Sequence, residues 1–524
     1  MYMNLRKYTY LIITLLAMAV SGCLTDNIPY PHIQANFTEI AAEGQERAAS
    51  IDSINRVVTF YMPEDVDIQA VEISSFSLTP DAYLTTDELA RPVDLSSPLQ
   101  VTLHLYYDYV WTLTAIQDIT REFSVDGQIG ASVIDEPAHR VVATVSDRQD
   151  LSKIKVLTCK LGASGSTLTP DIAGKTVDFT QPVEVTVSQW GRSETWTIYI
   201  DTTESLVSTS RVDAWTSVAW VYGNTEASRP YGVEYRLKGD DEWLSAPEAW
   251  LSRNGGTFSA RLIHLTPNTE YEARAVSGDD AGEAITFTTG MAVQPPNMDF
   301  DSWWLDGKIW CPWAQNGTPY WGTGNKGATT LGPSNTTPTE DTPTGRGYAA
   351  QLLTKFVGIG AMGKLAAGNI FTGDFVAVDG TNGILSFGRP FTERPTRLKG
   401  YMKYKTAPIS SVADGFRDLE GRPDTCIIWC ALIDQPEPYE IRTRPSNRHL
   451  FDSDGPTVVA YGKVEYGYDI DAYIPFEFEL DYRSTDRVPK YIIITASASK
   501  YGDYFVGGNG ATLWLDDFVL EYDY

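Results

Sequence analysis

A repeat of about 84 residues between positions 28 and 200 is the feature that most restricts the fold. Arg56-Val57-Val58 recurs as Arg140-Val141-Val142, and Trp111-Thr112-Leu113 recurs as Trp196-Thr197-Ile198. Apolar and polar residues alternate within each copy, as in Val183-Glu184-Val185-Thr186-Val187, which predicts half-buried strands. The two copies therefore predict two tandem β-sandwiches.

The length of each copy is that of one immunoglobulin-like sandwich, so we assign residues 23–125 and 126–203 to Ig-like repeats 1 and 2. Asp52 and Asp135 are equivalent residues beside turns, where a carboxylate either caps the turn or ligates a cation; we favour the cap. Cys159 aligns with Phe76, which predicts a small core residue and not a reactive thiol.

The N-terminus has the pattern of an export signal. Arg6 and Lys7 precede an apolar run that ends at Val20, and Ser21-Gly22-Cys23 follows. Such a run is too short for a spanning helix, and small residues before a Cys resemble a bacterial lipobox. We expect residues 1–22 to be a lipoprotein signal peptide and Cys23 to carry the lipid that anchors the chain. An ordinary signal peptide with an incidental Cys is the alternative.

The composition indicates an exported, all-β protein of several domains. A chain of 524 residues exceeds the size of a single core. Its Gly, Pro and Tyr content, with alternating Val and Thr, is typical of sandwiches. A net charge of −27 argues against nucleic acid and anionic lipid as partners.

The cysteines do not predict a disulfide framework. Cys426 and Cys430 would lie on one face of a strand about 13 Å apart, too far to bridge. A bond from Cys311 to either remains an alternative, but we expect buried free thiols. The spacing is not that of a zinc site, and no His lies near.

Residues 204–290 resemble a fibronectin type III domain. Ser217-Val218-Ala219-Trp220 reads as a strand with a core Trp, and Tyr231-Gly232-Val233-Glu234-Tyr235-Arg236 as the next strand. In Leu265-Thr266-Pro267-Asn268-Thr269-Glu270-Tyr271, the resemblance places Tyr271 at the tyrosine corner, whose hydroxyl bonds to upstream backbone. The implied role is a spacer or an interaction module.

Five of the fourteen tryptophans lie between Trp303 and Trp321. Gly, Pro and Asn interrupt this stretch and predict loops. Aromatic rings on loops offer rigid faces to a flat, weakly charged ligand, although burial in the core is the simpler interpretation of any single Trp. We expect stacking on a ligand from Trp303, Trp304, Trp310, Trp313, Tyr320 and Trp321, and hydrogen bonds to it from Asn325, Lys326 and Arg389.

Residues 291–524 contain a series of short motifs: Asp301-Ser302-Trp303, Gly322-Thr323-Gly324-Asn325-Lys326-Gly327, Asp379-Gly380-Thr381-Asn382-Gly383 through Gly388-Arg389-Pro390, and Trp514-Leu515-Asp516-Asp517-Phe518. With these motifs the region resembles the putative carbohydrate metabolism domain (PCMD) of Bacteroidota lipoproteins. The resemblance implies a jelly-roll β-sandwich similar to carbohydrate-binding modules, and no established reaction. It also implies a structural calcium held by Asp299 or Asp301 together with Asp516; a turn and strand-edge role for Asp516-Asp517 is the alternative.

No catalytic or nucleotide signature stands out in this region. Gly358 to Gly363 fits a dinucleotide pattern, but no βαβ context follows, so we interpret it as a Gly-rich turn between strands. His449, the only histidine after residue 290, lies in a predicted surface loop without a nucleophile signature. Glycoside hydrolysis needs only two carboxylates, and the candidates are Asp306, Glu340, Asp341, Asp374 and Asp424.

The sequence therefore predicts a lipid-anchored protein of the outer membrane, exposed at the cell surface. We expect it to bind nutrient polymers, a glycan first of all, as an accessory to a SusC/SusD-type uptake system. The alternatives are an oligopeptide-binding lipoprotein, a carboxylate-dependent glycoside hydrolase and a structural or adhesive stalk. A catalytic role is the less favoured interpretation, and no cofactor besides calcium is expected.

Overall fold

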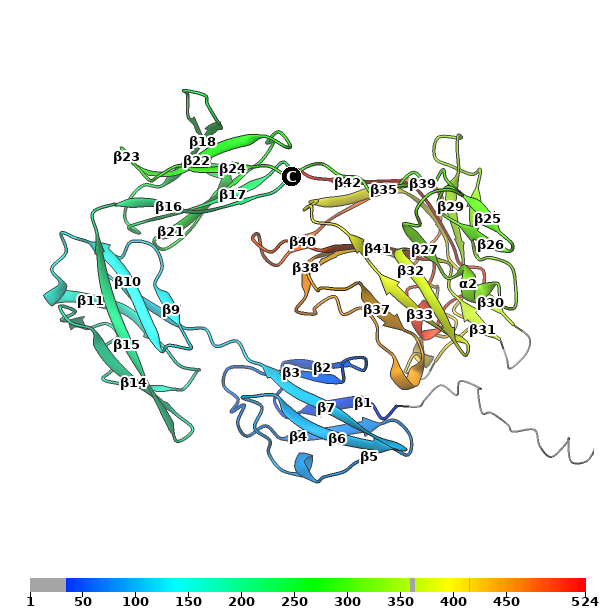
Figure 1. Cartoon of the computed structure of the whole chain (residues 1–524), viewed down its shortest axis with the longest axis horizontal. Helices are drawn as coiled ribbons and strands as arrows, with labels where there is room; N and C mark the ends of the chain where they lie inside the picture. The colour runs from blue at the N-terminus through cyan, green and yellow to red at the C-terminus, as the bar shows by residue number, and fades with distance from the viewer. Residues whose placement is uncertain (1–33, 359–362, 414) are drawn as a thin grey trace, which may run out of the picture. The chain divides into compact units, whose positions relative to one another are not determined.

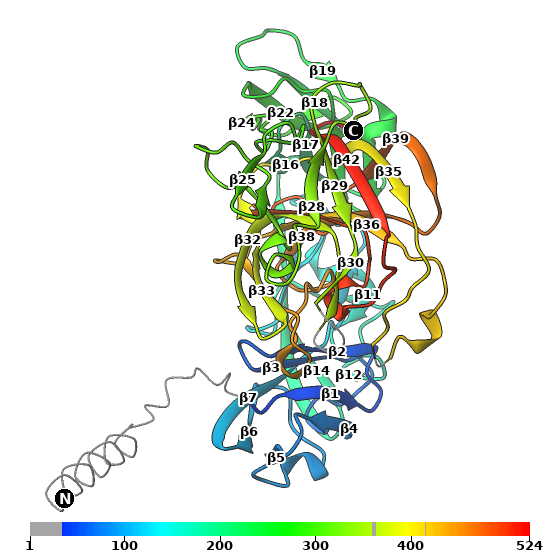
Figure 2. The same ribbon diagram turned by 90° about the vertical axis from the view of Figure 1, so that its right-hand side faces the viewer.

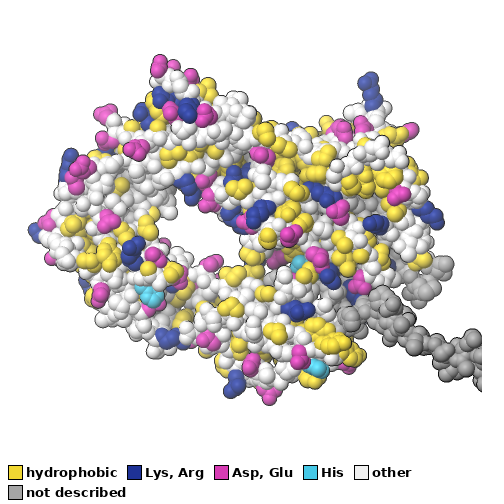
Figure 3. Space-filling view, in the orientation of Figure 1, with side chains coloured by type: hydrophobic (Ala, Val, Ile, Leu, Met, Phe, Trp, Pro, Cys, Tyr) yellow, Lys and Arg dark blue, Asp and Glu magenta, His cyan; other side chains and the backbone are white. Residues whose placement is uncertain are grey.

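The computed structural model describes residues 34–358, 363–413 and 415–524. Nearly all their regular structure is β-strand, which confirms the predicted all-β class of packed sandwiches (Figure 1). The signal peptide and Cys23 lie outside the described residues. Within these ranges, no helix has the length and hydropathy needed to span a bilayer. Acidic and basic side chains are interspersed on the face that Figure 3 shows.

The first repeat surrounds a buried cluster that includes Trp111, whose indole Nε1 donates to the carbonyl of Ala35 at 3.0 Å. One sheet pairs β1 with β4, and the other has the order β2-β3-β7-β6-β5. The elements are β1 (Phe37–Ala42), β2 (Arg47–Asp52), β3 (Val57–Tyr61), β4 (Ile73–Leu78), β5 (Tyr83–Leu84), η1 (Glu88–Ala90), β6 (Leu99–Leu105) and β7 (Tyr107–Ile116).

The second repeat has its own buried cluster, in which Trp196 takes the place of Trp111. Its sheets have the orders β12-β14-β15-β10-β9 and β13-β11-β8. The elements are β8 (Glu122–Val125), β9 (Val133–Asp135), β10 (Arg140–Ser146), η2 (Leu151–Lys153), β11 (Ile154–Lys160), β12 (Thr167–Thr169), β13 (Thr176–Val177), β14 (Val183–Gln189) and β15 (Arg192–Thr203). Strand β8 ends at residue 125, the expected last residue of repeat 1. It nevertheless pairs with β11 of the second repeat.

The sequence repeat is also a repeat of strand pairing. Strand β3 runs parallel to β7, with Val57 beside Thr112, and β10 runs parallel to β15, with Arg140 beside Thr197. The capping role of Asp52 and Asp135 is confirmed, because their carboxylates accept hydrogen bonds from the next turn's backbone N–H groups. The name "Ig-like" stays a prediction.

The third segment contains one cluster of buried apolar side chains between two sheets. One sheet has the order β16-β17-β21-β20, and the other has the order β19-β18-β22, with β23 and β24 also paired to β22. The elements are β16 (Val207–Ala214), β17 (Ala219–Thr225), β18 (Gly232–Leu237), β19 (Leu244–Ser245), η3 (Glu248–Trp250), β20 (Leu251–Asn254), β21 (Thr257–Leu262), β22 (Glu270–Ser277), β23 (Asp280–Ala281) and β24 (Ile285–Thr288). The tyrosine corner is confirmed, because the backbone N–H of Thr266 donates to the Tyr271 hydroxyl at 3.0 Å.

Trp220 is not the core tryptophan that the sequence predicted. In β17, Ala219 and Val221 point into the cluster, so Trp220 between them points to the other side of the sheet and is only half-buried. The fully buried tryptophan of this segment is Trp215, which contacts Trp220 edge to face. The sequence correctly predicted a strand here, but it placed Trp220 on the wrong side of the sheet.

The C-terminal domain is a larger sandwich. A nine-stranded sheet has the order β37-β33-β32-β41-β36-β38-β40, with β27 paired to β32 and β34 paired to β41. A five-stranded sheet has the order β28-β29-β42-β35-β39. Figure 2 shows the closing strand β42 between β29 and β35. The main core, which includes Leu398, Ile494 and Leu515, fills the space between the two sheets.

The elements of this domain begin with two short hairpin strands and end with the closing strand. They are β25 (Trp304–Asp306), β26 (Ile309–Cys311), β27 (Trp321–Thr323), α2 (Asn325–Ala328), β28 (Thr336–Thr339), β29 (Ala349–Leu353), β30 (Lys355–Val357), β31 (Lys364–Ala366), β32 (Asn369–Asp379), β33 (Asn382–Phe387), β34 (Arg389–Pro390), β35 (Arg397–Lys405), η5 (Arg417–Leu419), β36 (Cys426–Ile433), β37 (Tyr439–Arg442), η6 (Pro445–Asn447), β38 (Val458–Tyr466), β39 (Ile470–Glu479), β40 (Asp481–Tyr482), β41 (Tyr491–Ser497), η7 (Gly502–Tyr504) and β42 (Thr512–Glu521).

The cysteines of the described residues are free and buried, as predicted. Cys426 and Cys430 both face the main core from β36, while Cys159 packs in the second repeat opposite Phe123. Burial raises the pKa of the Cys159 thiol to about 11, so it has little thiolate at neutral pH. Phe76, at the matching place in the first repeat, is 40% exposed.

Candidate functional site

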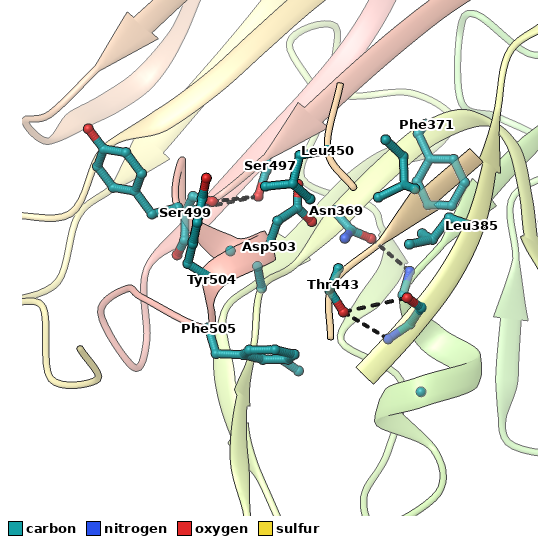
Figure 4. Close-up of a pocket in the computed structure, with 18 of the residues that line it drawn as sticks. Asn369, Phe371, Leu385, Thr443, Leu450, Ser497, Ser499, Asp503, Tyr504 and Phe505 are labelled. Carbon is teal, nitrogen blue, oxygen red and sulfur yellow. Dashed lines mark hydrogen bonds between the residues drawn. The ribbon is translucent and has the colours of Figure 1, made fainter. Parts of the chain in front are cut away.

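A cavity of about 480 Å³ covers the outer face of the nine-stranded sheet (Figure 4). Residues of β36 show which face this is. Ile428, Cys430 and Leu432 belong to the main core between the sheets, whereas Trp429 belongs to a second apolar cluster on the opposite face. That second cluster is the floor of the cavity. We call this site the aromatic groove.

A chain of ring contacts forms the floor of the aromatic groove. Phe371 and Phe387 lie 4.7 Å apart between centroids, and Phe387 lies 6.2 Å from Trp429. Phe451, from the connection between β37 and β38, stacks on Trp429 at 4.8 Å with an interplanar angle of 17°. Tyr461 closes the chain at 6.0 Å from Trp429. Phe371, Phe387 and Trp429 are buried and fix the floor from below, while the half-buried Phe451 and Tyr461 offer the rigid apolar surface that a ligand ring can reach.

Polar side chains surround this floor. They include Asn382, Thr443, Lys463, Glu465, Thr495, Ser497, Lys500 and Asp503. The Glu465 carboxylate accepts hydrogen bonds from Lys463 at 2.8 Å and Lys500 at 2.7 Å. Burial alone would raise the pKa of Glu465, but these two hydrogen bonds outweigh it and the pKa is lowered, so Glu465 is ionised at neutral pH.

One end of the groove is built from Asp503 and Tyr504, which lie in η7, and from Phe505, which follows it (Figure 4). Phe505 has a positive φ of 59°, unusual for a bulky residue, and its ring lies 4.0 Å from the Lys364 ammonium nitrogen. The Arg448 guanidinium lies 4.5 Å from the Tyr504 ring centroid. Burial raises the pKa of Asp503 to about 6, and the Arg448 charge limits the rise.

The six predicted stacking rings do not share one surface. Trp321 is 1% exposed, and its indole Nε1 donates to the Pro296 carbonyl, so it belongs to the main core. Trp303 packs half-buried against the same core. Trp304 and Trp313 contact each other edge to face at 6.5 Å, and the Trp304 Nε1 has no hydrogen-bond partner among the described residues.

Trp310 lines a second hollow of about 700 Å³ together with exposed residues such as Leu305 of β25 and Leu331. It is the only aromatic side chain among the described residues that line this hollow. The second hollow is therefore larger but lacks the ring floor and the charged rim of the aromatic groove. Geometry favours the aromatic groove as the main site.

The remaining predicted ligand contacts are engaged within the domain. The Asn325 amide donates to the carbonyls of Trp310 and Thr336 and accepts from two backbone N–H groups, which uses its full capacity. Arg389 holds Asp374 through two nitrogens, and its other donors reach the Tyr320 and Gly373 carbonyls. Tyr320 is half-buried, and burial raises its pKa well above the usual range. Lys326 is exposed and donates to the Phe375 carbonyl at 3.3 Å.

The expected calcium ligands lie near one another without forming a metal cluster. No group of three or more His, Cys, Asp or Glu side chains placed to hold a metal occurs in the part of the chain that is described. Burial, with the charges of Asp517, Asp301 and Asp299, raises the pKa of Asp516 to about 7. Asp516 accepts the backbone N–H of Asp517, which has a positive φ of 50° at a bulge in β42. The calcium site stays a prediction.

None of the five carboxylates proposed from sequence lines the groove. Asp424, the buried one, accepts hydrogen bonds from Ser499 at 2.6 Å and from the Gly508 backbone at 2.7 Å. The groove's acids are Glu465 and Asp503, which sequence reasoning missed. His449 lies in the connection between β37 and β38, as predicted, but it is half-buried and stacks on Tyr439 instead of lying freely at the surface. Residues 359–362 of the Gly-rich stretch lie outside the described residues, and the antiparallel strands β30 and β31 flank them.

A signal for the groove was present in the sequence. Strands β36 and β41 read Cys-Ile-Ile-Trp-Cys-Ala-Leu-Ile and Tyr-Ile-Ile-Ile-Thr-Ala-Ser, without the usual alternation. Continuous apolar runs of this kind belong to strands covered on both faces. They indicate that a further layer lies over the outer face of the sheet, and the groove forms beneath that layer.

Comparisons with known proteins give two family matches. Residues 299–521 match the family described as "Putative carbohydrate metabolism domain", and residues 119–200 match the family described as "SGBP, N-terminal". No curated protein matches the chain.

Two solved structures are similar over long stretches. A putative glycoside hydrolase from Bacteroides thetaiotaomicron VPI-5482 is 18% identical with a TM-score of 0.31, covering 78% of this chain and 97% of its own. Another from Bacteroides vulgatus ATCC 8482 is 23% identical with a TM-score of 0.33, covering 43% of this chain and 96% of its own. Scores this low carry no argument about function. The C-terminal domain, residues 299–521, is therefore similar to the putative carbohydrate metabolism domain family, and it follows a segment that matches the SGBP N-terminal family.

Proposed function

We propose that the protein binds a nutrient carbohydrate at the cell surface, in the aromatic groove of its C-terminal domain. The part-exposed rings of Phe451 and Tyr461, supported from below by buried Trp429, are the observation that carries the proposal, because sugar rings present flat C–H faces that stack on aromatic rings. The polar rim supplies hydrogen-bond partners for hydroxyls. The names of both matched families, carbohydrate metabolism and surface glycan binding, support the same ligand class.

The binding test is a glycan and peptide array probed with residues 24–524, followed by titration calorimetry with the best ligand. Phe451→Ala removes a floor ring, and Tyr501→Ala removes a half-exposed ring of the lining. Each substitution is expected to weaken binding about tenfold. Tyr468→Ala, at a 61% exposed ring outside the groove, is the matched control.

The same array distinguishes the alternatives. Binding of peptides but not glycans would identify an oligopeptide-binding lipoprotein, and no binding at all would favour a stalk. If Trp313→Ala or Trp310→Ala loses binding and Phe451→Ala keeps it, the binding site lies in the tryptophan-rich stretch from Trp303 to Trp321 and not in the aromatic groove.

We propose that lipid on Cys23 holds the protein on the outer membrane, outward-facing, beside a SusC/SusD-type transporter. Membrane attachment is tested by labelling cells with an alkyne fatty acid. The label is expected on the wild-type chain and absent from Cys23→Ser. Protease added to intact cells is expected to cleave the wild-type protein, whereas full protection would place it inside the envelope.

A second candidate function is glycoside hydrolysis, which the two groove acids favour. Asp503, with a pKa near 6, suits a general acid, while Glu465 is held ionised. Release of reducing ends from the array's best glycan is expected to disappear in both Asp503→Asn and Glu465→Gln if the pair is catalytic. Unchanged glycan in the wild-type reaction would leave binding as the function.

A further inference from the structure

Two cations at the Asp503 end of the groove are not neutralised by ion pairs. Among the described residues, neither Lys364 nor Arg448 has a carboxylate within 4.0 Å, whereas Lys463 and Lys500 share Glu465. Lys364 donates to the Asn382 side-chain oxygen at 3.0 Å. Arg448 donates only to the Thr443 carbonyl, at 3.3 and 3.4 Å, which leaves part of its five-donor fork unused.

Both cations converge on one short segment. The Lys364 ammonium lies over Phe505 and the Arg448 guanidinium over Tyr504, and these two residues directly follow Asp503. Both cations are half-buried. Burial lowers the pKa of each, and the Arg448 charge lowers that of Lys364 further. Like charges partly removed from water are unfavourable unless an anion joins them.

The charge around this end is positive, although the chain carries −27 overall. Lys364 and Arg448 face Asp503, which leaves one net positive charge when Asp503 is ionised. Across the groove, Lys463 and Lys500 both pair with Glu465, so these three side chains carry one further net positive charge. Arg444, after β37, is paired with Asp379, and Arg442, at the end of β37, is paired with Glu440. These two ion pairs add no net charge. An anionic group entering the groove therefore meets an attractive field.

We propose that the Asp503 end of the aromatic groove binds an anionic substituent of the carbohydrate, a carboxylate or a sulfate group, at Lys364, with Arg448 as a second positive charge beside it. This inference rests on the proposed function and names its substrate class as acidic glycans. The Lys364 ammonium lines the groove and supplies charge-assisted hydrogen bonds to such a group. Arg448 lies outside the lining, over the Tyr504 ring, and adds electrostatic attraction.

The Asp503 carboxylate makes this binding depend on pH. As pH falls from 7.5 to 5.0, Asp503 gains a proton and the net charge at this end rises from one positive to two positive. Uronate and sulfate groups remain ionised over this range. The affinity for an acidic glycan is therefore expected to rise as pH falls, and Asp503→Asn is expected to bind equally at both pH values.

The test is titration calorimetry of residues 24–524 at pH 7.5 and 5.0 with three polymers: polygalacturonate, which carries carboxylate, κ-carrageenan, which carries sulfate and no carboxylate, and a neutral galactan. An acidic polymer is expected to bind at least about tenfold more tightly than the neutral one. Lys364→Gln and Arg448→Gln are each expected to remove most of that preference, and Arg448→Lys to restore part of it. Lys308→Gln, an exposed lysine outside the groove, is the charge-matched control.

His449 lies in the same connection but does not line the groove, because its ring stacks on Tyr439 and Nδ1 contacts the Glu440 carbonyl. His449→Gln is therefore expected to keep the pH dependence. Equal or tighter binding of neutral polymers that is lost in Phe451→Ala would overturn this inference and leave the proposed function standing. Absence of binding to every polymer would overturn both. Comparison of the affinities for the sulfated and the carboxylated polymer shows which anion the site binds.

Discussion

Neighbouring residues of one strand serve different purposes in the C-terminal domain. In β36, Cys430 packs between the two sheets, while Trp429 on the opposite face forms the groove floor. A shift of register by one residue would exchange these faces. The function of a tryptophan here therefore follows from the side of the sheet it occupies and not from the local density of tryptophans.

Trp321→Ala tests this distinction. Trp321 is buried between Phe300 and Phe518, so its removal leaves a cavity and is expected to lower the free energy of unfolding by about 3–5 kcal/mol. Trp313→Ala, at a half-buried loop position, is expected to cost about 1 kcal/mol or less. Urea denaturation followed by fluorescence measures both. Similar losses in the two variants would contradict the assignment of Trp321 to the core.

Asp424→Ala is expected to destabilise the domain by about 2–4 kcal/mol. The Asp424 carboxylate is buried, and its removal leaves the Ser499 hydroxyl and the Gly508 N–H without this acceptor. Asp374→Ala, which removes an exposed partner of Arg389, is the matched control and is expected to cost about 1 kcal/mol or less. Equal melting temperatures for the two variants would show that the buried network contributes little.

Asp516 is expected to make stability fall as pH rises. Its folded pKa of about 7 lies above the ordinary value, so the protonated form stabilises the fold. That contribution is fully present below about pH 4 and is lost as pH rises through 7. Asp516→Asn is therefore expected to raise the melting temperature by a few degrees at pH 8 and by less at pH 5, in buffer with a chelator. A gain independent of pH would contradict this account.

Added calcium tests the predicted ion, because an ion bound at Asp516 would raise the melting temperature of the wild-type protein and not that of Asp516→Asn.

At the scale of elements, β32 shapes the groove by changing partners along its length. Its first residues pair with β41, and those from Gly373 onward pair with β33. Gly373 has a φ of 140°, and a Cβ there would lie 2.1 Å from the Ser386 carbonyl oxygen. Only glycine allows this close approach of the two backbones.

Gly373→Ala is accordingly expected to separate β33 from β32 and to weaken ligand binding together with stability. Hydrogen exchange of residues 382–387 measures the separation directly. Gly380→Ala is the control, because its φ of 65° lies in the left-handed region, where Ala is less strained than at 140°, and nothing lies within 4 Å of the added Cβ. Unchanged exchange in Gly373→Ala would show that the contact relaxes elsewhere.

The strands were more predictable than the site. Local alternation was sufficient to predict the repeat and the closing strand, and the tyrosine corner followed from a short motif. The groove unites β32, β33, β36, β38 and the segment from η7 to Phe505. Its lining residues Asn369 and Phe505 are 136 positions apart (505 − 369), and no local pattern predicts such pairing. Asp503 and Glu465 have no motif of their own, since their surroundings alone shift their pKa values.

At the scale of the whole molecule, each of four sequence segments has its own buried cluster, and the C-terminal domain has a second one. This organisation predicts that the segments unfold separately. In scanning calorimetry, a ligand of the groove is expected to raise the transition of the C-terminal domain alone. Trp196→Ala is expected to lower a different transition. A single transition that moves as one in both experiments would contradict independent unfolding.

The most direct test of the central claim is the affinity of residues 24–524 for their best array glycan, compared between Phe451→Ala and Trp313→Ala. If the aromatic groove is the binding site, Phe451→Ala weakens binding about tenfold or more and Trp313→Ala leaves it unchanged. The opposite pattern, with binding lost in Trp313→Ala and kept in Phe451→Ala, would contradict the account.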